Sequence, residues 1–301
     1  MRSVHFILFA LSCLCSLVWA FPTQFENTKV VRVIEINTGI AREDIGVRAK
    51  NVDTKPATDY YFYLPHIVTQ NAASISAFLR KQKTPLDVAL QQADDDVNVY
   101  KVTLNEAIQP QQDLLLGIKV TYTHIVKPMP AKLPQVAKQH TVYAFNSYFL
   151  SPYLSKEVKT TLQTPTKGIV GHTGAENKSN AKDNKIVYGP YVDVPPRSFQ
   201  LATAHFENTK PMITVTQLER DIQVSHWGNK LSVEEHYAVR NDGAQLDSDF
   251  NRVKYMMSQP IHEQTNVWKG LSYQLPQDAH DPYYRDEVGN VSTSRFRVEP
   301  T

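Results

Sequence analysis

Cysteine is almost absent from this sequence. The chain has 301 residues and two cysteines, Cys13 and Cys15, which both lie in an apolar segment near the N-terminus. The rest of the chain therefore has no disulfide bonds, no thiolate metal ligands and no cysteine nucleophile. Without disulfides the protein must be held together by its own hydrophobic core, which a chain of this length can supply.

Net charge and glycine are scarce as well. The 32 Lys and Arg residues are nearly balanced by 30 Asp and Glu residues, which leaves a net charge of +2. A nucleic-acid partner is therefore not expected, since its binding needs a basic patch or stripe. The 11 glycines are outnumbered by 18 prolines and 15 tyrosines. Together with many Val and Thr residues, this composition favours strands and loops over helices.

Long hydrophobic runs are missing after the N-terminus. Beyond Phe21 the longest apolar runs, such as Leu114–Leu116, have the size of a strand, whereas a membrane-spanning helix needs about 20 residues. The N-terminus itself combines Arg2 with an apolar run at Val4–Val18. This pattern predicts a secretory signal peptide that is cleaved after Ala20 and takes both cysteines with it. An uncleaved signal anchor is the alternative.

Motifs of known catalytic or binding chemistry are also absent. The histidines are scattered without the HExxH spacing of a zinc site, and the chain has no glycine-rich phosphate loop and no GxSxG elbow. Asp94–Asp96 lacks the glycine and the distal Glu of a calcium loop. We therefore predict no catalytic, cofactor-binding or metal-binding residue. A pair of carboxylates that meets only in space stays open, because such pairs leave no sequence pattern.

Two short patterns predict modification. Asn177-Lys178-Ser179 and Asn290-Val291-Ser292 are acceptor sequences for N-glycosylation. Asn177 lies in the polar stretch 168–185, which we expect to be a surface loop. Asn290 follows a glycine, so we expect it in a turn.

A tryptophan beside a turn is the other specific feature. Trp227 precedes Gly228-Asn229 between two alternating apolar and polar segments. A Trp in this position usually anchors a hairpin against the core, and a contact with a partner is the alternative.

The chain contains an apparent internal repeat. The pentapeptide FENTK occurs at 25–29 and again at 206–210, each time followed by a Val/Ile/Thr-rich segment, a turn and an alternating segment that ends in Asn51 or Asn241. Strands at such spacing with turn signals between them predict β-sandwiches. In the first copy the expected strands are 29–36, 45–49, 60–64, 97–104 and 116–122, and a further strand is expected at 143–148. We also expect a short helix at 152–162.

The domain organisation follows from the repeat. We predict a signal peptide at 1–20, a first β-rich domain at 21–187, a linker at 188–205 and the start of a second β-rich domain at 206–301. The linker is placed at the proline-rich segment around Tyr188–Pro196, because paired prolines cannot continue a central strand.

Four segments together resemble the ribophorin I family, subunit 1 of the oligosaccharyltransferase, in a fungal form. They are YFLSPY at Tyr148–Tyr153, YGPYVDVPP at Tyr188–Pro196, VSHWGN at Val224–Asn229 and YRDEVGNVSTS at Tyr284–Ser294. Several of these segments are long and unusual in composition, and the matches extend from Phe25 to Ser294.

The resemblance implies a type I membrane protein of the endoplasmic reticulum, with two tandem β-rich domains in the lumen and a transmembrane helix after them. It implies a complex that transfers a preassembled oligosaccharide from dolichyl diphosphate to Asn in Asn-x-Ser/Thr. In that complex the family member is not the catalytic subunit and carries no cofactor. Its implied partners are the other subunits, including the catalytic one, with a nascent polypeptide as a further candidate.

This sequence departs from the family pattern at its end. It stops at Thr301, inside the expected second domain, and contains no transmembrane helix. We therefore expect a C-terminally truncated member whose second domain is incomplete. Two alternatives to the non-catalytic subunit remain. One is a secreted or lumenal β-sandwich that binds glycan or polypeptide, and the other is a hydrolase with carboxylates assembled in space.

Overall fold

The computed structural model describes residues 23–93, 96–208, 210–258, 270–276, 279–291, 294–295 and 297. The predicted signal peptide, its cleavage site after Ala20 and both cysteines lie outside these residues. The chain divides into two compact units, 1–266 and 267–301, and each is described by itself. Within the described residues, no helix has the length and hydrophobicity needed to cross a membrane.

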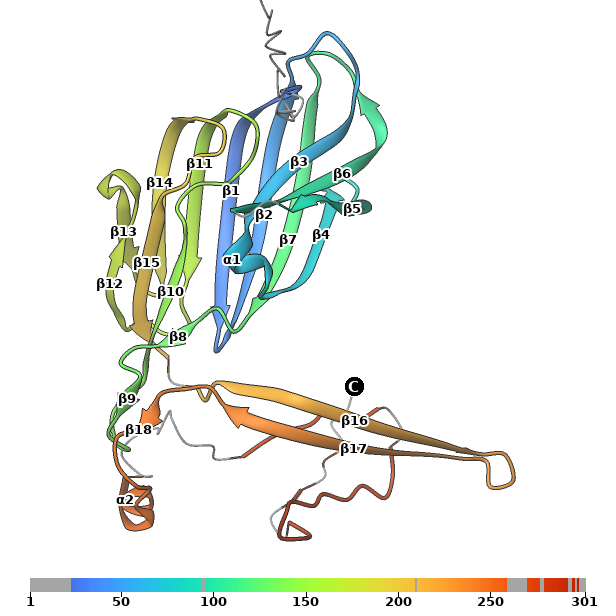
Figure 1. Ribbon diagram of the computed structural model, residues 1–301, viewed down its shortest axis with the longest axis vertical. Coiled ribbons are helices and arrows are strands. Elements are labelled where there is room, and N and C mark those ends of the chain that lie inside the picture. The colour runs from blue at the N-terminus through green and yellow to red at the C-terminus, as the bar shows by residue number, and fades with distance from the viewer. Residues whose placement is uncertain are drawn as a thin grey trace, which may run out of the picture. The chain divides into compact units, whose positions relative to one another are not determined.

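The larger unit is built on one broad sheet (Figure 1). Its ten strands, in their order across the sheet, are β13 (Ser179–Lys182), β14 (Lys185–Val194), β11 (Ser155–Gln163), β1 (Phe25–Asn37), β2 (Ile40–Asn51), β7 (Asp113–Thr123), β4 (Ala72–Leu79), β5 (Thr84–Ala93), β6 (Val97–Ile108) and β3 (Ala57–Pro65).

The remaining elements are smaller. A second sheet has the order β12 (Ile169–Thr173), β15 (Leu201–Glu207), β10 (His140–Asn146) and β8 (Lys127–Pro128). Two further pairs are β9 (Lys132–Leu133) with β18 (Gln245–Leu246), and β16 (Ile213–Ser225) with β17 (Lys230–Asn241). The described helices are α1 (His66–Thr69), the 3-10 turn η1 (Ala175–Asn177) and α2 (Arg252–Ser258).

Strand β1 lies inside the broad sheet because both of its edges are paired. It runs antiparallel to β2 and parallel to β11. Its side chains alternate strictly after a bulge at Asn27/Lys29, so that Val30, Ile34 and Ile36 are buried. This period of two is the pattern expected of a strand with one buried face, and each large apolar side chain buried this way contributes roughly 1.5–3 kcal/mol.

The second sheet packs on the buried face of the first through aromatic side chains. Phe145 from β10 meets the ring of Tyr188 from β14 edge-on, with 5.2 Å between the ring centroids. Phe206 from β15 is fully buried in the same core. The two layers therefore form a β-sandwich, visible in Figure 1 where β10 and β15 cross in front of β11 and β14. The predicted fold class, mainly β, is confirmed.

Most of the expected strands are confirmed, but the helix predicted at 152–162 is wrong. That segment forms β11, which starts at Ser155 and alternates between buried and exposed residues. Val158, Thr160 and Leu162 all point into the core, which is the period of a strand and not of a helix. The stretch 168–185, expected to be a loop, contains β12 and β13.

The segment 188–205, predicted as a linker, contains the end of β14, up to Val194, and most of β15, from Leu201. Its role as a linker between two domains stays a prediction. The prolines lie where strand pairing is interrupted or has ended. Pro190 lies in a bulge of β14, where the register against β11 shifts, and Pro195-Pro196 follow directly after the strand ends at Val194. A bulge is one of the few sites where a strand tolerates proline.

The two FENTK copies occupy different places in this fold. Phe25 begins β1, whereas Phe206 lies near the end of β15, in the second sheet of the same sandwich. The pentapeptide therefore does not start two equivalent strands. The boundary between the two predicted domains stays a prediction.

The smaller unit is described mainly around one turn. Arg285 and Asn290 form an isolated antiparallel bridge. Between them, the Asp286 side chain accepts hydrogen bonds from the backbone N–H groups of Val288 and Gly289. Gly289 has a φ of +139°, a backbone conformation that favours glycine.

Candidate functional site

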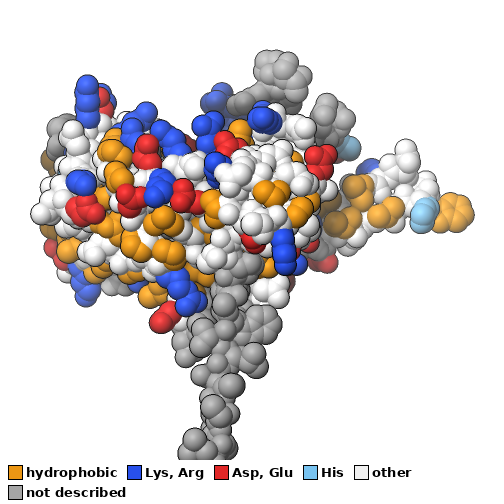
Figure 2. All heavy atoms as spheres, turned by 90° about the horizontal axis from the view of Figure 1, so that it is seen from above, with side chains coloured by type: hydrophobic (Ala, Val, Ile, Leu, Met, Phe, Trp, Pro, Cys, Tyr) orange, Lys and Arg blue, Asp and Glu red, His pale blue; other side chains and the backbone are white. Residues whose placement is uncertain are grey.

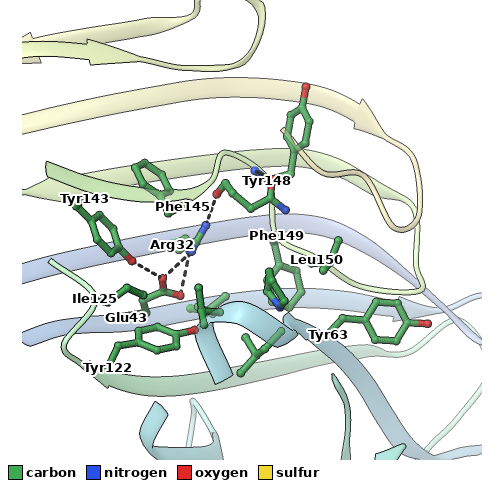
Figure 3. A pocket seen from close by; sticks show the side chains of 15 residues that line it. Arg32, Glu43, Tyr63, Tyr122, Ile125, Tyr143, Phe145, Tyr148, Phe149 and Leu150 are labelled. Carbon is green, nitrogen blue, oxygen red and sulfur yellow. Dashed lines mark hydrogen bonds and ion pairs between the residues drawn. The ribbon is translucent and has the colours of Figure 1, made fainter. Parts of the chain in front are cut away.

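The most concentrated polar chemistry of the larger unit is a buried ion pair between β1 and β2 (Figure 3). Arg32 donates from Nη2 to Glu43 Oε1 at 2.6 Å and from Nε to Glu43 Oε2 at 3.1 Å. Its Nη1 donates to the backbone oxygen of Asn146, at the end of β10, at 2.6 Å. The hydroxyl of Tyr143, also on β10, donates to Glu43 Oε1 at 3.3 Å. The pair therefore joins the two sheets.

Neighbouring strands bring these groups together. Arg32 and Glu43 both point inward from positions that lie diagonally across the β1–β2 ladder, where Arg32 faces Ile45 and Glu43 faces Ile34. The guanidinium also lies 5.6 Å from the centre of the Phe145 ring. Side chains at such diagonal positions are within reach when they are long.

Burial governs the electrostatics of this cluster. Desolvation alone lowers the pKa of Arg32, but the attraction and hydrogen bonds of Glu43 more than offset it, so the pKa is raised. Burial raises the pKa of Tyr143 and of Tyr122 well above 10.0, and the nearby Glu43 carboxylate adds to both shifts. The two phenols therefore stay neutral at physiological pH, and the Arg32 guanidinium stays charged.

The cavity beside the pair is small. Its volume is about 40 Å³, and its lining includes Arg32, Glu43 and Tyr122 as well as Phe149 and Leu150. A water molecule needs roughly 10–15 Å³ of such space, so the cavity has room for a few waters and not for a sugar or a peptide. The cluster therefore has a structural role, which is to join the two sheets.

A second buried polar cluster contains Asn27, the third residue of the first FENTK. Its Nδ2 donates to the hydroxyls of Ser151 and Ser155, both at 3.1 Å. Its Oδ1 accepts a hydrogen bond from the hydroxyl of Tyr60 at 2.9 Å. Three buried hydrogen bonds satisfy this side chain, and they connect β1 to β3 and to the start of β11.

The β16–β17 hairpin exposes a row of large hydrophobic side chains. Paired residues with the same orientation form one apolar face. It consists of Ile213, Val215, Leu218, Ile222 and Val224 from β16 and Leu231, Val233, Tyr237 and Val239 from β17. All five of these β16 residues, and Leu231 and Val233 of β17, are exposed. Figure 2 shows hydrophobic side chains along the arm that extends to the right.

The tip of this hairpin differs from expectation. Trp227 has a relative exposure of 101%, so among the described residues it does not anchor the hairpin against a core. The alternative, a contact with a partner, stays a prediction. The turn itself is closed by a hydrogen bond from Gly228 N–H to the hydroxyl of Ser225 at 3.2 Å.

The two predicted glycosylation acceptors are both exposed. Asn177 ends the 3-10 turn η1 with a φ of +53°. The hydroxyl of Ser179, the third residue of its sequon, lies 2.9 Å from His172 Nδ1. Asn290 lies in the turn of the smaller unit, as expected. Asn177 belongs to the larger unit and Asn290 to the smaller one.

Among the described residues, no group of three His, Cys, Asp or Glu side chains could hold a metal ion. The two buried polar clusters were not predicted from the sequence. One signal was present, since Arg32 occupies an inward position of the alternating segment Val30–Ile36. An Arg in such a position needs a buried acid nearby.

The family model and the curated relatives that match this chain point to the same family. A family model described as Ribophorin I matches residues 25–300. The chain is 30% identical over 274 residues to the dolichyl-diphosphooligosaccharide–protein glycosyltransferase subunit 1 of Caenorhabditis elegans, which covers 91% of this chain and 46% of that relative. It is 30% identical over 276 residues to subunit 1B of Arabidopsis thaliana, covering 89% of this chain and 59% of that relative.

The chain spans about half the length of these curated relatives. Among solved structures, native yeast LTA4 hydrolase is similar with a TM-score of 0.36 and 10% identity, over 64% of this chain and 30% of that chain.

Proposed function

The chain belongs to the ribophorin I family, and on this basis we propose that it acts as a subunit of the oligosaccharyltransferase. This complex transfers a preassembled oligosaccharide from dolichyl diphosphate to Asn in Asn-x-Ser/Thr of nascent proteins. The observation that carries the proposal is the family match over residues 25–300. Relatives at about 30% identity that bear the name of glycosyltransferase subunit 1 support it.

We further propose that this subunit is not the catalytic one. The buried ion pair of the sandwich, Arg32 with Glu43, is enclosed by the core, and each group is already hydrogen-bonded. A catalytic carboxylate must reach its substrate within hydrogen-bond distance. The buried location of this pair supports a scaffold role for the sandwich.

The proposed setting follows from the same family. The β-rich domains lie on the lumenal side of the endoplasmic reticulum, the full-length protein is a type I membrane protein, and the partners are the other subunits of the complex. The face seen in Figure 2 carries interspersed charges of both signs.

The proposal is tested by affinity capture of the tagged full-length protein from detergent-solubilised membranes, with the captured proteins identified by mass spectrometry. We expect the catalytic subunit of the glycosyltransferase among them in comparable amount. Recovery of the tagged protein as a stable monomer without that subunit would contradict the proposal.

We also propose that Asn177 and Asn290 carry N-linked glycans. The exposure of both side chains supports this, since a glycan needs space on the surface. In the protein expressed through the secretory pathway, Asn177→Gln and Asn290→Gln should each remove one glycan. Each variant should therefore lose less mass on glycosidase treatment, by the mass of one glycan. Asn180→Gln, which changes an exposed Asn outside any sequon, is the matched control and should leave the mass pattern unchanged.

A further inference from the structure

The predicted glycan acceptor Asn177 lies in the connection between two edge strands. Strand β12 ends the smaller sheet, and β13 ends the broad sheet. Residues 174–178, which contain the turn η1, join the two strands. The strands lie next to each other at one side of the sandwich (Figure 1), and a hydrogen bond between the side chains of His172 and Ser179 connects them. Asn177 therefore lies where the edges of both sheets meet.

The outer edges of these strands are unpaired in the described part of the chain. There, β12 pairs with β15 alone and β13 pairs with β14 alone. The open edge continues along β14, because β13 pairs only with its first four residues, Lys185–Tyr188, whereas β14 extends to Val194. Two valines at these edges, Val170 of β12 and Val192 of β14, are 60% and 65% exposed. An open edge with apolar side chains can pair with a strand of another chain.

The opposite edge of the broad sheet is covered by the chain itself. Its end strand is β3, where the backbone N–H of Tyr63 donates to the backbone oxygen of Leu150 at 2.9 Å. The N–H of Tyr61 donates to the hydroxyl of Tyr153 at 3.1 Å. Along β13, no described residue outside the sheet makes a backbone hydrogen bond of this kind. The two edges of the same sheet are therefore protected differently.

Backbone hydrogen bonds place Asn177 beside the open part of β14. The N–H of Gly189 donates to the backbone oxygen of Lys178 at 2.9 Å, so the chain follows β14 up to this point. Asn177 is the preceding residue, its side chain is exposed, and its φ is +53°. Because neighbouring Cα atoms are about 3.8 Å apart, a glycan on Asn177 would begin directly where the outer edge of β14 becomes unpaired.

We propose that the N-linked glycan on Asn177 shields the open edges of β12, β13 and β14 against pairing with a strand of a second copy of this chain. The inference deepens the proposed modification of Asn177 and rests on it. A glycan is bulky and solubilising, and a pairing strand must approach to about 4.8 Å. A sugar chain at this position therefore excludes the second strand without making any specific contact with the protein.

Disulfide trapping in the full-length protein, expressed through the secretory pathway, tests the inference. Residues 21–301 contain no cysteine, so Asn180→Cys places a single new thiol on an exposed position of β13 and keeps the sequon. Two copies that pair along this edge bring their thiols within reach of a disulfide. Glu35→Cys, on the exposed face of β1, is the control for random collision, and the chain without either change is the background control.

The glycan is removed in three independent ways. Asn177→Gln and Ser179→Ala each destroy the sequon, whereas Ser179→Thr keeps both the sequon and the hydroxyl that faces His172. Glycosidase treatment of the folded, glycosylated protein removes the glycan without any substitution, so a folding defect of a variant does not decide the result. Each form is oxidised mildly in detergent extract, the disulfide-linked dimer is quantified, and the occupancy of Asn177 is measured by mass spectrometry.

We expect loss of the glycan to raise the yield of the Asn180→Cys dimer about tenfold, the factor that about 1.4 kcal/mol of strand pairing gives. Ser179→Thr should leave the yield low. Equal yields with and without the glycan, at an occupied Asn177, would overturn the inference and leave the modification standing. An unoccupied Asn177 would overturn both. An equal rise for Glu35→Cys would indicate unspecific aggregation and would overturn the inference as well.

Discussion

Replacing Glu43 by Leu should test whether the buried ion pair holds the sandwich together. The change removes two of the three hydrogen bonds of Arg32, those to the Glu43 carboxylate, and leaves the contact with the Asn146 backbone. The guanidinium then stays buried without a counter-charge. Breaking a buried pair in this way costs about 3–5 kcal/mol.

This cost should be large enough to measure directly. For a domain of this size, 1 kcal/mol shifts the melting temperature by roughly 2–4 °C, so we expect Glu43→Leu to lower it by roughly 6–20 °C. Urea unfolding followed by circular dichroism provides the free energy of unfolding, with an unchanged slope if both states keep their compactness. Glu35→Leu, on the exposed face of β1, is the control and should change stability by less than about 0.5 kcal/mol.

A double variant separates the two explanations of any loss. Arg32→Met combined with Glu43→Leu removes both charges and keeps similar volumes, so most of the stability should return, because apolar replacements of a buried pair are often neutral or stabilising. If the double variant is as unstable as Glu43→Leu alone, the loss comes from packing and the reasoning about the unpaired charge is refuted.

Two further predictions follow from backbone geometry and from buried phenols. Gly189→Ala should destabilise the protein by about 2–4 kcal/mol in urea unfolding, because Gly189 has a φ of +87° and a Cβ there would lie 2.8 Å from two backbone atoms. Gly171→Ala, which meets open space, should be near neutral, and equal losses in both would contradict this. Burial raises the pKa of Tyr60 and Tyr143 well above 10.0, so their contribution to stability is complete below that pH and is lost as the pH rises above it. Their tyrosinate absorbance at 295 nm should therefore appear only together with the loss of circular dichroism, and complete ionisation before unfolding would argue against burial.

Much of the strand content could be predicted because one-sided burial leaves a period of two in the sequence. Lys29–Ile36 and Leu116–Tyr122 show it clearly, and both segments are strands with one buried face. In β11 the same period holds only from Val158 onward, and the buried positions of the strand include Ser155 and Thr160, whose hydroxyls form hydrogen bonds inside the core. Buried hydroxyls hide the pattern, and the sequence alone therefore predicts a helix here.

The buried polar clusters were beyond prediction for another reason. Their members are far apart in the sequence, as with Asn27 and Tyr60, or Glu43 and Tyr143, which are 33 and 100 residues apart. Only the pairing of strands brings them together, and that pairing includes a parallel contact between β1 and β11 that no local signal indicates. In the same way, Pro190 favours a linker when the sequence is considered alone. The bulge that accommodates this proline forms only where β14 pairs with β11, so the sequence does not reveal it.

The parallel pairing of β1 with β11 has a consequence for synthesis. Asn27 and its partner Ser155 are 128 residues apart, so β1 emerges from the ribosome long before the strand that covers its second edge. At translation rates of about 5–20 residues per second, that interval is roughly 6–25 s. The β1–β2 hairpin forms within microseconds. Until β11 is synthesised, the second edge of β1 is unpaired and can pair with other chains. Cellular protection of that edge during this interval would therefore set the yield of folded protein.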